Sequence, residues 1–234
     1  MTNNNSISPK KGFTLLELLI VIAIMAILAA VAIFVLNPAE TLRETRDAQR
    51  VSDLATMKTA IALYITKTTS TIYLGNSGSN TTCKDSASWA SGDGINYSYP
   101  SDSPGAAITD ATLDSATSYP TSTQRTVASS SLVDGTGWIP VNLSSLVGGS
   151  PISDMPLDPT NSFVDGSVSD VRYTDLFYRY TCYSSDLTFE INARLESSSI
   201  GAKMTKDGGN NSSLYEVGTK LTIMGGGQAS ANQH

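Results

Sequence analysis

The sequence predicts an α+β fold in which a long N-terminal helix packs on an antiparallel β-sheet near the C-terminus. Three patterns in the 234 residues favour this class. After Glu17 the sequence is apolar without a break to Leu36. Apolar residues then recur at helical spacing to about Lys67. Two later segments, 177–183 and 187–195, alternate apolar and polar residues on either side of a short polar turn, which is typical of a β-hairpin.

The first half of the predicted helix is apolar enough to cross a membrane. From Phe13 to Leu36 it would extend ~36 Å at about 1.5 Å per residue, against a hydrocarbon core of ~30 Å. Glu17 lies inside this span, and a carboxylate in hydrocarbon usually marks a function and a partner. If the chain were cut after Gly12, Phe13 would gain an ammonium group that could neutralise Glu17 of a neighbouring copy. The pattern therefore predicts that the chain polymerises.

Two other interpretations of the N-terminus compete with this one. A secretory signal has an apolar core of roughly 7–15 residues that ends in small residues. The segment 30–32 could serve as such a cleavage site, but the apolar run before it is too long. A plain membrane anchor fits the length and leaves Glu17 unexplained.

The segment from Lys10 to Leu19 resembles the processing site of the type IV filament superfamily, which comprises type IV pilins and the pseudopilins of type II secretion. A short polar, basic leader ends at Gly12 and is followed by Phe-Thr-Leu-Leu-Glu-Leu-Leu. The resemblance implies that prepilin peptidase cuts after Gly12 and N-methylates Phe13. It also implies a helical filament of copies in which Phe13 and Glu17 set the register, built by an inner-membrane assembly platform and its ATPase.

The resemblance and the composition together divide the chain into six expected segments. They are a leader peptide (1–12), a transmembrane or filament-core helix (13–37), an amphipathic stalk helix (38–69), a variable Ser/Thr/Gly-rich region (70–137), the antiparallel sheet of a pilin-like head (138–224) and a flexible tail (225–234). Within the head we expect a short strand at 138–141 and a last strand at 214–224. The resemblance places the head outside the cytoplasmic membrane before assembly, and in an extracellular or periplasmic filament afterwards. Basic residues lie on both sides of the span, so the positive-inside rule does not decide the orientation.

The stalk helix carries two patterns of its own. Pro38 lacks an N–H and predicts a kink or a local break. Beyond it, a stripe of apolar residues would pack on the head: Val51, Leu54, Met57, Ile61 and Ile65. Arg43 with Asp47, and Asp47 with Arg50, can pair along the helix. Such pairs form either a solvated face or a contact between neighbouring stalks.

Two groups of residues in the head suggest a bond or a ligand site. Cys83 and Cys182 lie far apart with no metal-binding spacing around them, so in an oxidising exterior they predict a disulfide, with two buried thiols as the alternative. The segment 155–161 resembles the Leu-Pro-x-Asp-Pro segment of pseudopilin heads, several of which bind calcium nearby. The candidate oxygen ligands are Asp158, Asn161, Asp165, Asp170 and Asp175. The alternative is that these residues only form turns.

Composition argues against several other functions. The net charge of −6 offers no basic surface for nucleic acid. The one histidine, His234, is in the terminal tail, and no nucleophile–base motif or phosphate-binding loop is present. We therefore expect no enzyme and no required cofactor. The favoured function is a structural pilin, and the alternatives are a pseudopilin of a type II secretion-like system and a membrane-tethered surface-binding protein that does not polymerise.

Overall fold

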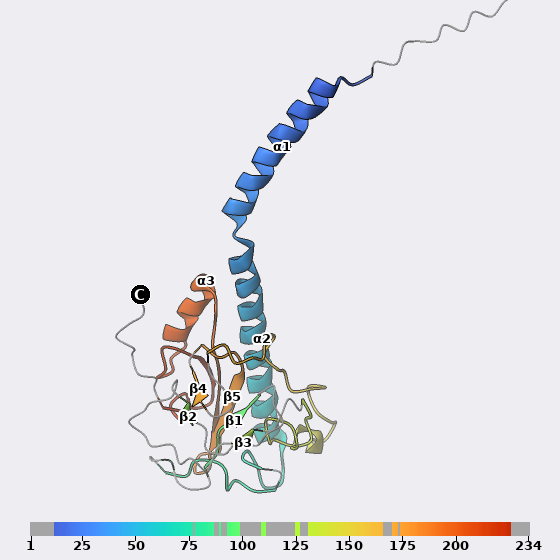
Figure 1. Cartoon of the computed structure of the whole chain (residues 1–234). Coiled ribbons are helices and arrows are strands. Elements are labelled where there is room, and N and C mark those ends of the chain that lie inside the picture. Colours follow the sequence, from blue (N-terminus) through green and yellow to red (C-terminus); the bar gives the residue numbers. More distant parts are fainter. Residues whose placement is uncertain are drawn as a thin grey trace, which may run out of the picture. The chain divides into compact units, whose positions relative to one another are not determined.

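The computed structural model describes residues 12–76, 78–86, 89, 93–98, 109–110, 125–126, 131–165, 170–172 and 174–225. The fold class is α+β, as predicted (Figure 1). Apart from Gly12 and Gly225, the predicted leader and the predicted tail lie outside the described residues. The chain divides into two compact units, one that ends at Leu42 and one that begins at Arg43.

The helices and strands follow in chain order. They are α1 (Leu15–Leu36), α2 (Pro38–Lys67), β1 (Asn96–Tyr97), β2 (Thr109–Asp110), β3 (Arg125–Thr126), the 3₁₀ turn η1 (Leu143–Ser145), β4 (Asp170–Val171), β5 (Tyr178–Tyr183), β6 (Thr188–Ala193), α3 (Ser198–Gly201), the 3₁₀ turn η2 (Ala202–Thr205) and β7 (Tyr215–Gly218).

The N-terminal unit is built on α1. Among the described residues one helical stretch, Leu15–Ile33, is long and apolar enough to cross a membrane, with a mean hydropathy of 3.0 and no buried residues. The helix ends at Asn37, whose φ of 38° lies in the left-handed region. Pro38 then begins α2, where its fixed φ is favourable and a missing N–H costs nothing. The helix is thus interrupted between Asn37 and Pro38.

The core of the second unit forms where α2 packs on one face of the sheet. Leu54, Met57 and Ile61 are fully buried and belong to one apolar cluster with alternate residues of β5 and β6. Of the predicted stripe, Val51 and Ile65 are only partly buried. Figure 1 shows α2 running beside β5, and the Tyr178 hydroxyl of β5 donates to Asp53 of α2 at 2.9 Å.

The main sheet has the strand order β3-β1-β5-β6-β7. The predicted hairpin is present: β5 and β6 are antiparallel, and Tyr180 lies opposite Ile191. β1 and β7 extend it to four antiparallel strands, and β3 joins β1 in parallel. Both β1 and β3 come from the variable region, so that region also contributes to the sheet. β2 and β4 form a separate parallel pair.

Two details of the predicted sheet differ from the structure. Residues 138–141 are buried but form no strand. Pro140 has no N–H to donate to a ladder, and Trp138 is held instead by its indole N–H, which donates to the Pro156 carbonyl at 3.1 Å. The last strand, β7, ends at Gly218 rather than near Met224. The backbone N–H groups of Ile223 and Met224 donate to a buried carboxylate and not to a neighbouring strand.

Candidate functional site

The processing segment adopts a capped helix start. Thr14 is the N-cap of α1, and its side chain accepts a hydrogen bond from the Glu17 N–H at 3.2 Å. In return, Glu17 accepts from the Thr14 N–H at 2.9 Å and from the Thr14 hydroxyl at 2.8 Å. This reciprocal capping box satisfies donors that a helix start otherwise leaves open. Glu17 is therefore at the third position of the helix and has partners within its own chain.

The residues on either side of the predicted cut are open to solvent. Phe13 is 84 % exposed. A Cβ added at Gly12 would meet no atom within 4 Å, so the packing of the described residues does not require glycine there.

A second group of polar residues is buried between α2 and the head. Arg50 is fully buried, and its guanidinium forms a two-pronged bond with Asp158, at 2.7 Å from Nε to Oδ2 and 2.9 Å from Nη2 to Oδ1. Its Nη1 donates to Asp47 at 2.8 Å and to Glu196 at 2.6 Å. We call Arg50, Asp47, Asp158 and Glu196 the arginine cluster. It joins α2 to the loop before β4 and to the segment after β6.

The charges of the arginine cluster compensate for its burial. Burial alone would lower the pKa of Arg50, but Asp158, Glu196 and Asp47 together raise this pKa above its ordinary value. Burial alone would raise the pKa of Glu196, but hydrogen bonds from Arg46 and Arg50 hold it below the ordinary value. Asp47 also accepts from the backbone N–H of Ser197 at 2.7 Å. Each of the three acids is thus paired with Arg50.

This geometry corrects the prediction for the charges of α2. Asp47 and Arg50 do pair along the helix, but both side chains have 0 % exposure. They form neither a solvated face nor a surface that a neighbouring stalk could reach. The spacing held a signal for this, because Asp47 and Arg50 precede Leu54 by two turns and one turn and lie on the same helix face. Residue type alone predicts that the charged Asp47 and Arg50 lie on the surface.

Two of the candidate calcium ligands, Asp158 and Asp175, accept several hydrogen bonds from within the chain. Besides Arg50, Asp158 receives the N–H groups of Thr160 and Asn161, at 2.8 and 3.1 Å. Asp175 accepts three backbone N–H groups, from residues 164, 165 and 172, at 2.7–3.1 Å.

Of the other three candidate ligands, the Asn161 side chain accepts from the Ser98 hydroxyl at 3.4 Å, and the Asp165 N–H is one of those that Asp175 accepts. Asn161 has a left-handed φ of 44°, Asp165 is exposed, and the side chain of Asp170 lies outside the described residues. Within the described part of the chain, no three His, Cys, Asp or Glu side chains gather as a metal site. Calcium binding stays a prediction, and the structure gives Asp158 and Asp175 roles that need no metal.

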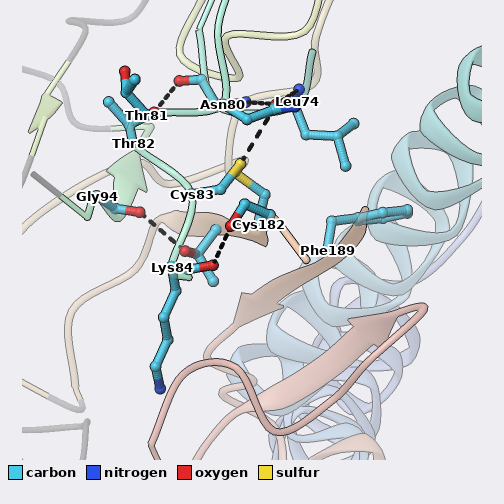
Figure 2. The surroundings of a disulfide bond; sticks show 12 residues. Leu74, Asn80, Thr81, Thr82, Cys83, Lys84, Gly94, Cys182 and Phe189 are labelled. Atoms are coloured by element: carbon cyan, nitrogen blue, oxygen red, sulfur yellow. Dashed lines mark hydrogen bonds between the residues drawn. A yellow bond between two sulfur atoms is a disulfide. The ribbon is translucent and has the colours of Figure 1, made fainter. Parts of the chain in front are cut away.

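The predicted disulfide is present between Cys83 and Cys182, which lie 99 residues apart in sequence (Figure 2). Beside it, the Lys84 N–H donates to the Cys182 carbonyl at 2.9 Å, so the segment after Cys83 continues along the edge of β5. Gly75 passes so close that an added Cβ would lie 2.9 Å from the Cys83 sulfur. The bond thus fixes part of the variable region to the sheet.

A family model described as the prokaryotic N-terminal methylation motif matches residues 7–33. The chain therefore carries the signature of type IV pilins and pseudopilins, a structural rather than a catalytic class. The motif implies processing by prepilin peptidase and assembly into pilus-type filaments. Neither a comparison with curated proteins nor one with solved structures found a match.

Proposed function

We propose that this chain is the structural subunit of a type IV pilus-like filament, processed between Gly12 and Phe13 and polymerised through α1. The observation that carries the proposal is the methylation motif at 7–33, with one carboxylate, Glu17, in an otherwise apolar helix. The large apolar side chains of α1 are exposed from Leu15 to Ile33. Such a surface needs hydrocarbon or other copies of itself around it.

The capping box gives Glu17 its hydrogen-bond partners before assembly. Cleavage after Gly12 leaves Thr14 in place, so the carboxylate keeps its own N–H and hydroxyl donors in the membrane. In the filament, the new ammonium group of Phe13 of a neighbouring copy competes for the same carboxylate. The Thr14 donors are neutral, whereas the ammonium group adds an opposite full charge, whose attraction to the carboxylate is strong where no water screens it. N-methylation keeps the positive charge, so the pairing survives it.

The disulfide supports an exported head. Disulfides persist in oxidising compartments and are rare in the cytosol, and Cys83 and Cys182 are joined here. We therefore propose a subunit with its N-terminus inside and its head outside the cytoplasmic membrane. An assembly platform and its ATPase would extract it into the growing filament, and the mature filament would be extracellular.

Paired variants of Thr14 and Glu17 test the mechanism. We expect Glu17→Gln to insert and to be processed but to assemble poorly, because its amide can still cap the helix while it has no charge for the neighbouring ammonium group. Thr14→Ala keeps the charge and removes the cap hydroxyl, and we expect it to assemble. The measurement is the yield of sheared filaments relative to membrane-bound mature protein. Abundant filaments from Glu17→Gln, or equal loss in both variants, would contradict the charge-pair mechanism.

A pseudopilin of a type II secretion-like system is the second candidate. It is favoured by the segment 155–161, which resembles a segment of pseudopilin heads. Mature protein that forms only short periplasmic assemblies would support it. A membrane-tethered surface-binding protein would instead remain a processed monomer. The same fractionation therefore separates all three functions.

A further inference from the structure

A buried acidic pair lies on the face of the sheet opposite α2. Successive residues of a strand point to opposite faces, so Glu190 and Asn192 of β6 and Glu216 of β7 share the face that α2 does not cover. All three are almost completely buried, with exposures of 0, 0 and 2 %. A second apolar cluster, which includes Leu214 and Met224, belongs to the same unit. Two buried carboxyl groups on one sheet face are unusual, because burial disfavours their charged form.

Glu190 and Glu216 are neighbours, because they lie on the same face of the adjacent antiparallel strands β6 and β7. An ionised carboxylate has no hydrogen-bond donor, so a bond between the two carboxyl groups would require a proton on one of them. Like charges side by side and out of water would strongly disfavour the doubly ionised form.

The pair also holds the segment that follows β7. One oxygen of Glu190 accepts the N–H groups of both Ile223 and Met224, at 2.8 and 3.0 Å. One oxygen of Glu216 accepts the Asn211 N–H at 2.8 Å. Lys84 adds a bond from its ammonium group to the Ile223 carbonyl at 3.3 Å. The bonds of Glu190 and Lys84 hold the segment 221–225 at Ile223 and Met224, and the bond of Glu216 holds Asn211 beside them.

We propose that Glu190 and Glu216 form a proton-dependent latch. While they share a proton, the latch holds residues 221–225 on the sheet. Loss of that proton leaves two adjacent buried carboxylates, and the segment detaches so that water can reach them.

The charges around the latch come from several elements. They are Arg179 on β5, Lys84 and Asp93 before β1, Asp207 after η2, and Lys220 after β7. Burial is the main cause that raises the pKa of Glu190, to about 7. Burial and then the charge of Glu190 raise the pKa of Glu216, to about 9. Lys84 is itself buried, which lowers the pKa of its ammonium group.

The sign of the pH effect follows from these directions. A carboxyl group whose pKa is higher in the folded state than in the unfolded chain stabilises the fold below the ordinary carboxyl value. That contribution is lost as the pH rises through the folded values of about 7 and about 9. The latch is therefore closed in mild acid and opens in the alkaline range.

Hydrogen exchange of the full chain in detergent tests the latch. Protection factors, corrected for the intrinsic pH dependence of exchange, are compared at about pH 5 and about pH 9 for residues 221–225 and for β5. We expect protection of 221–225 to fall by at least about tenfold, since each unit of pKa shift is a factor of ten, while β5 changes less. Equal protection of 221–225 at both pH values would overturn the proposal.

Two variants identify the group that titrates. In Glu216→Gln the amide donates to Glu190 without a titrating proton and can still accept from Asn211, so protection should no longer depend on pH. Glu44→Gln is the matched control, because the Glu44 carboxylate accepts from the hydroxyl of the exposed Ser199 at 2.6 Å and lies outside the latch. This control should keep the wild-type pH dependence. If Glu216→Gln loses protection at alkaline pH as the unmodified chain does, the effect belongs to Lys84 or another group and the proposal is overturned.

A measurement on the unmodified chain covers the case in which Glu216→Gln fails to fold. A protonated carboxyl group has an infrared carbonyl band of its own, separate from that of carboxylates. We expect this band to persist at about pH 7, where exposed acids are ionised, and to disappear as the alkaline opening proceeds. A spectrum without it at neutral pH would show that the pair holds no proton there and would overturn the latch.

Discussion

At the scale of single residues, the polar groups that matter most in the head are the buried ones. Arg50 lies in the same helical stripe as Leu54, Met57 and Ile61, yet it carries a full charge. Its burial is compatible with folding because three carboxylates surround it. Replacing one partner of a buried ion pair is far more costly than replacing an exposed charge, since the remaining charges stay buried without compensation.

Arg50→Met tests this role. The variant keeps an apolar stem of similar length but leaves Asp158 and Asp47 without their guanidinium partner. We expect the free energy of unfolding of the full chain in detergent to fall by about 3–5 kcal/mol, measured by denaturant titration with tryptophan fluorescence.

Arg43→Met is the control on the same helix. Arg43 is exposed, and substitutions at such positions usually change stability by no more than about 0.5 kcal/mol. An Arg50→Met effect as small as that of Arg43→Met would contradict the account of the arginine cluster.

At the scale of elements, the sequence predicted most of what rests on periodicity. The long helix, its interruption near Pro38 and the β5–β6 hairpin follow from apolar spacing and turn residues. β1 could not be predicted, because two residues in a Ser/Thr-rich region have no period to detect. The early end of β7 depends on Glu190, a contact between residues more than thirty positions apart. Local patterns cannot reveal such a contact.

Among the features at this scale, the disulfide is expected to have the largest effect on the free energy of unfolding. It closes a loop across a sequence separation of 99 residues, for which loop-closure entropy predicts about 4.7 kcal/mol. We expect Cys83→Ala with Cys182→Ala to lower the free energy of unfolding by up to about that amount. The same denaturant titration measures it.

A reducing agent provides the control for this prediction. It should destabilise the unmodified chain and leave the double variant unchanged. Equal stability of the oxidised, reduced and doubly substituted forms would show that the bond does not constrain the unfolded chain.

At the scale of the whole molecule, the two units differ in the chemistry of their surfaces. The head has a closed apolar core and buries its charged clusters. The apolar side chains of the stretch Leu15–Ile33 have no cover within the described residues. The sequence could predict this contrast and the processing motif, because both are local. It could not predict the arginine cluster or the acidic pair, because both depend on which distant segments meet.

The central claim is that the chain is cut after Gly12 and polymerises through the new N-terminus. The most direct test is mass spectrometry of the N-terminal residue in the sheared extracellular fraction, combined with negative-stain imaging of the same fraction. The account predicts filaments whose subunits begin with N-methylated Phe13. A chain that keeps Met1, or a mature protein that stays in the membrane without filaments, would contradict it.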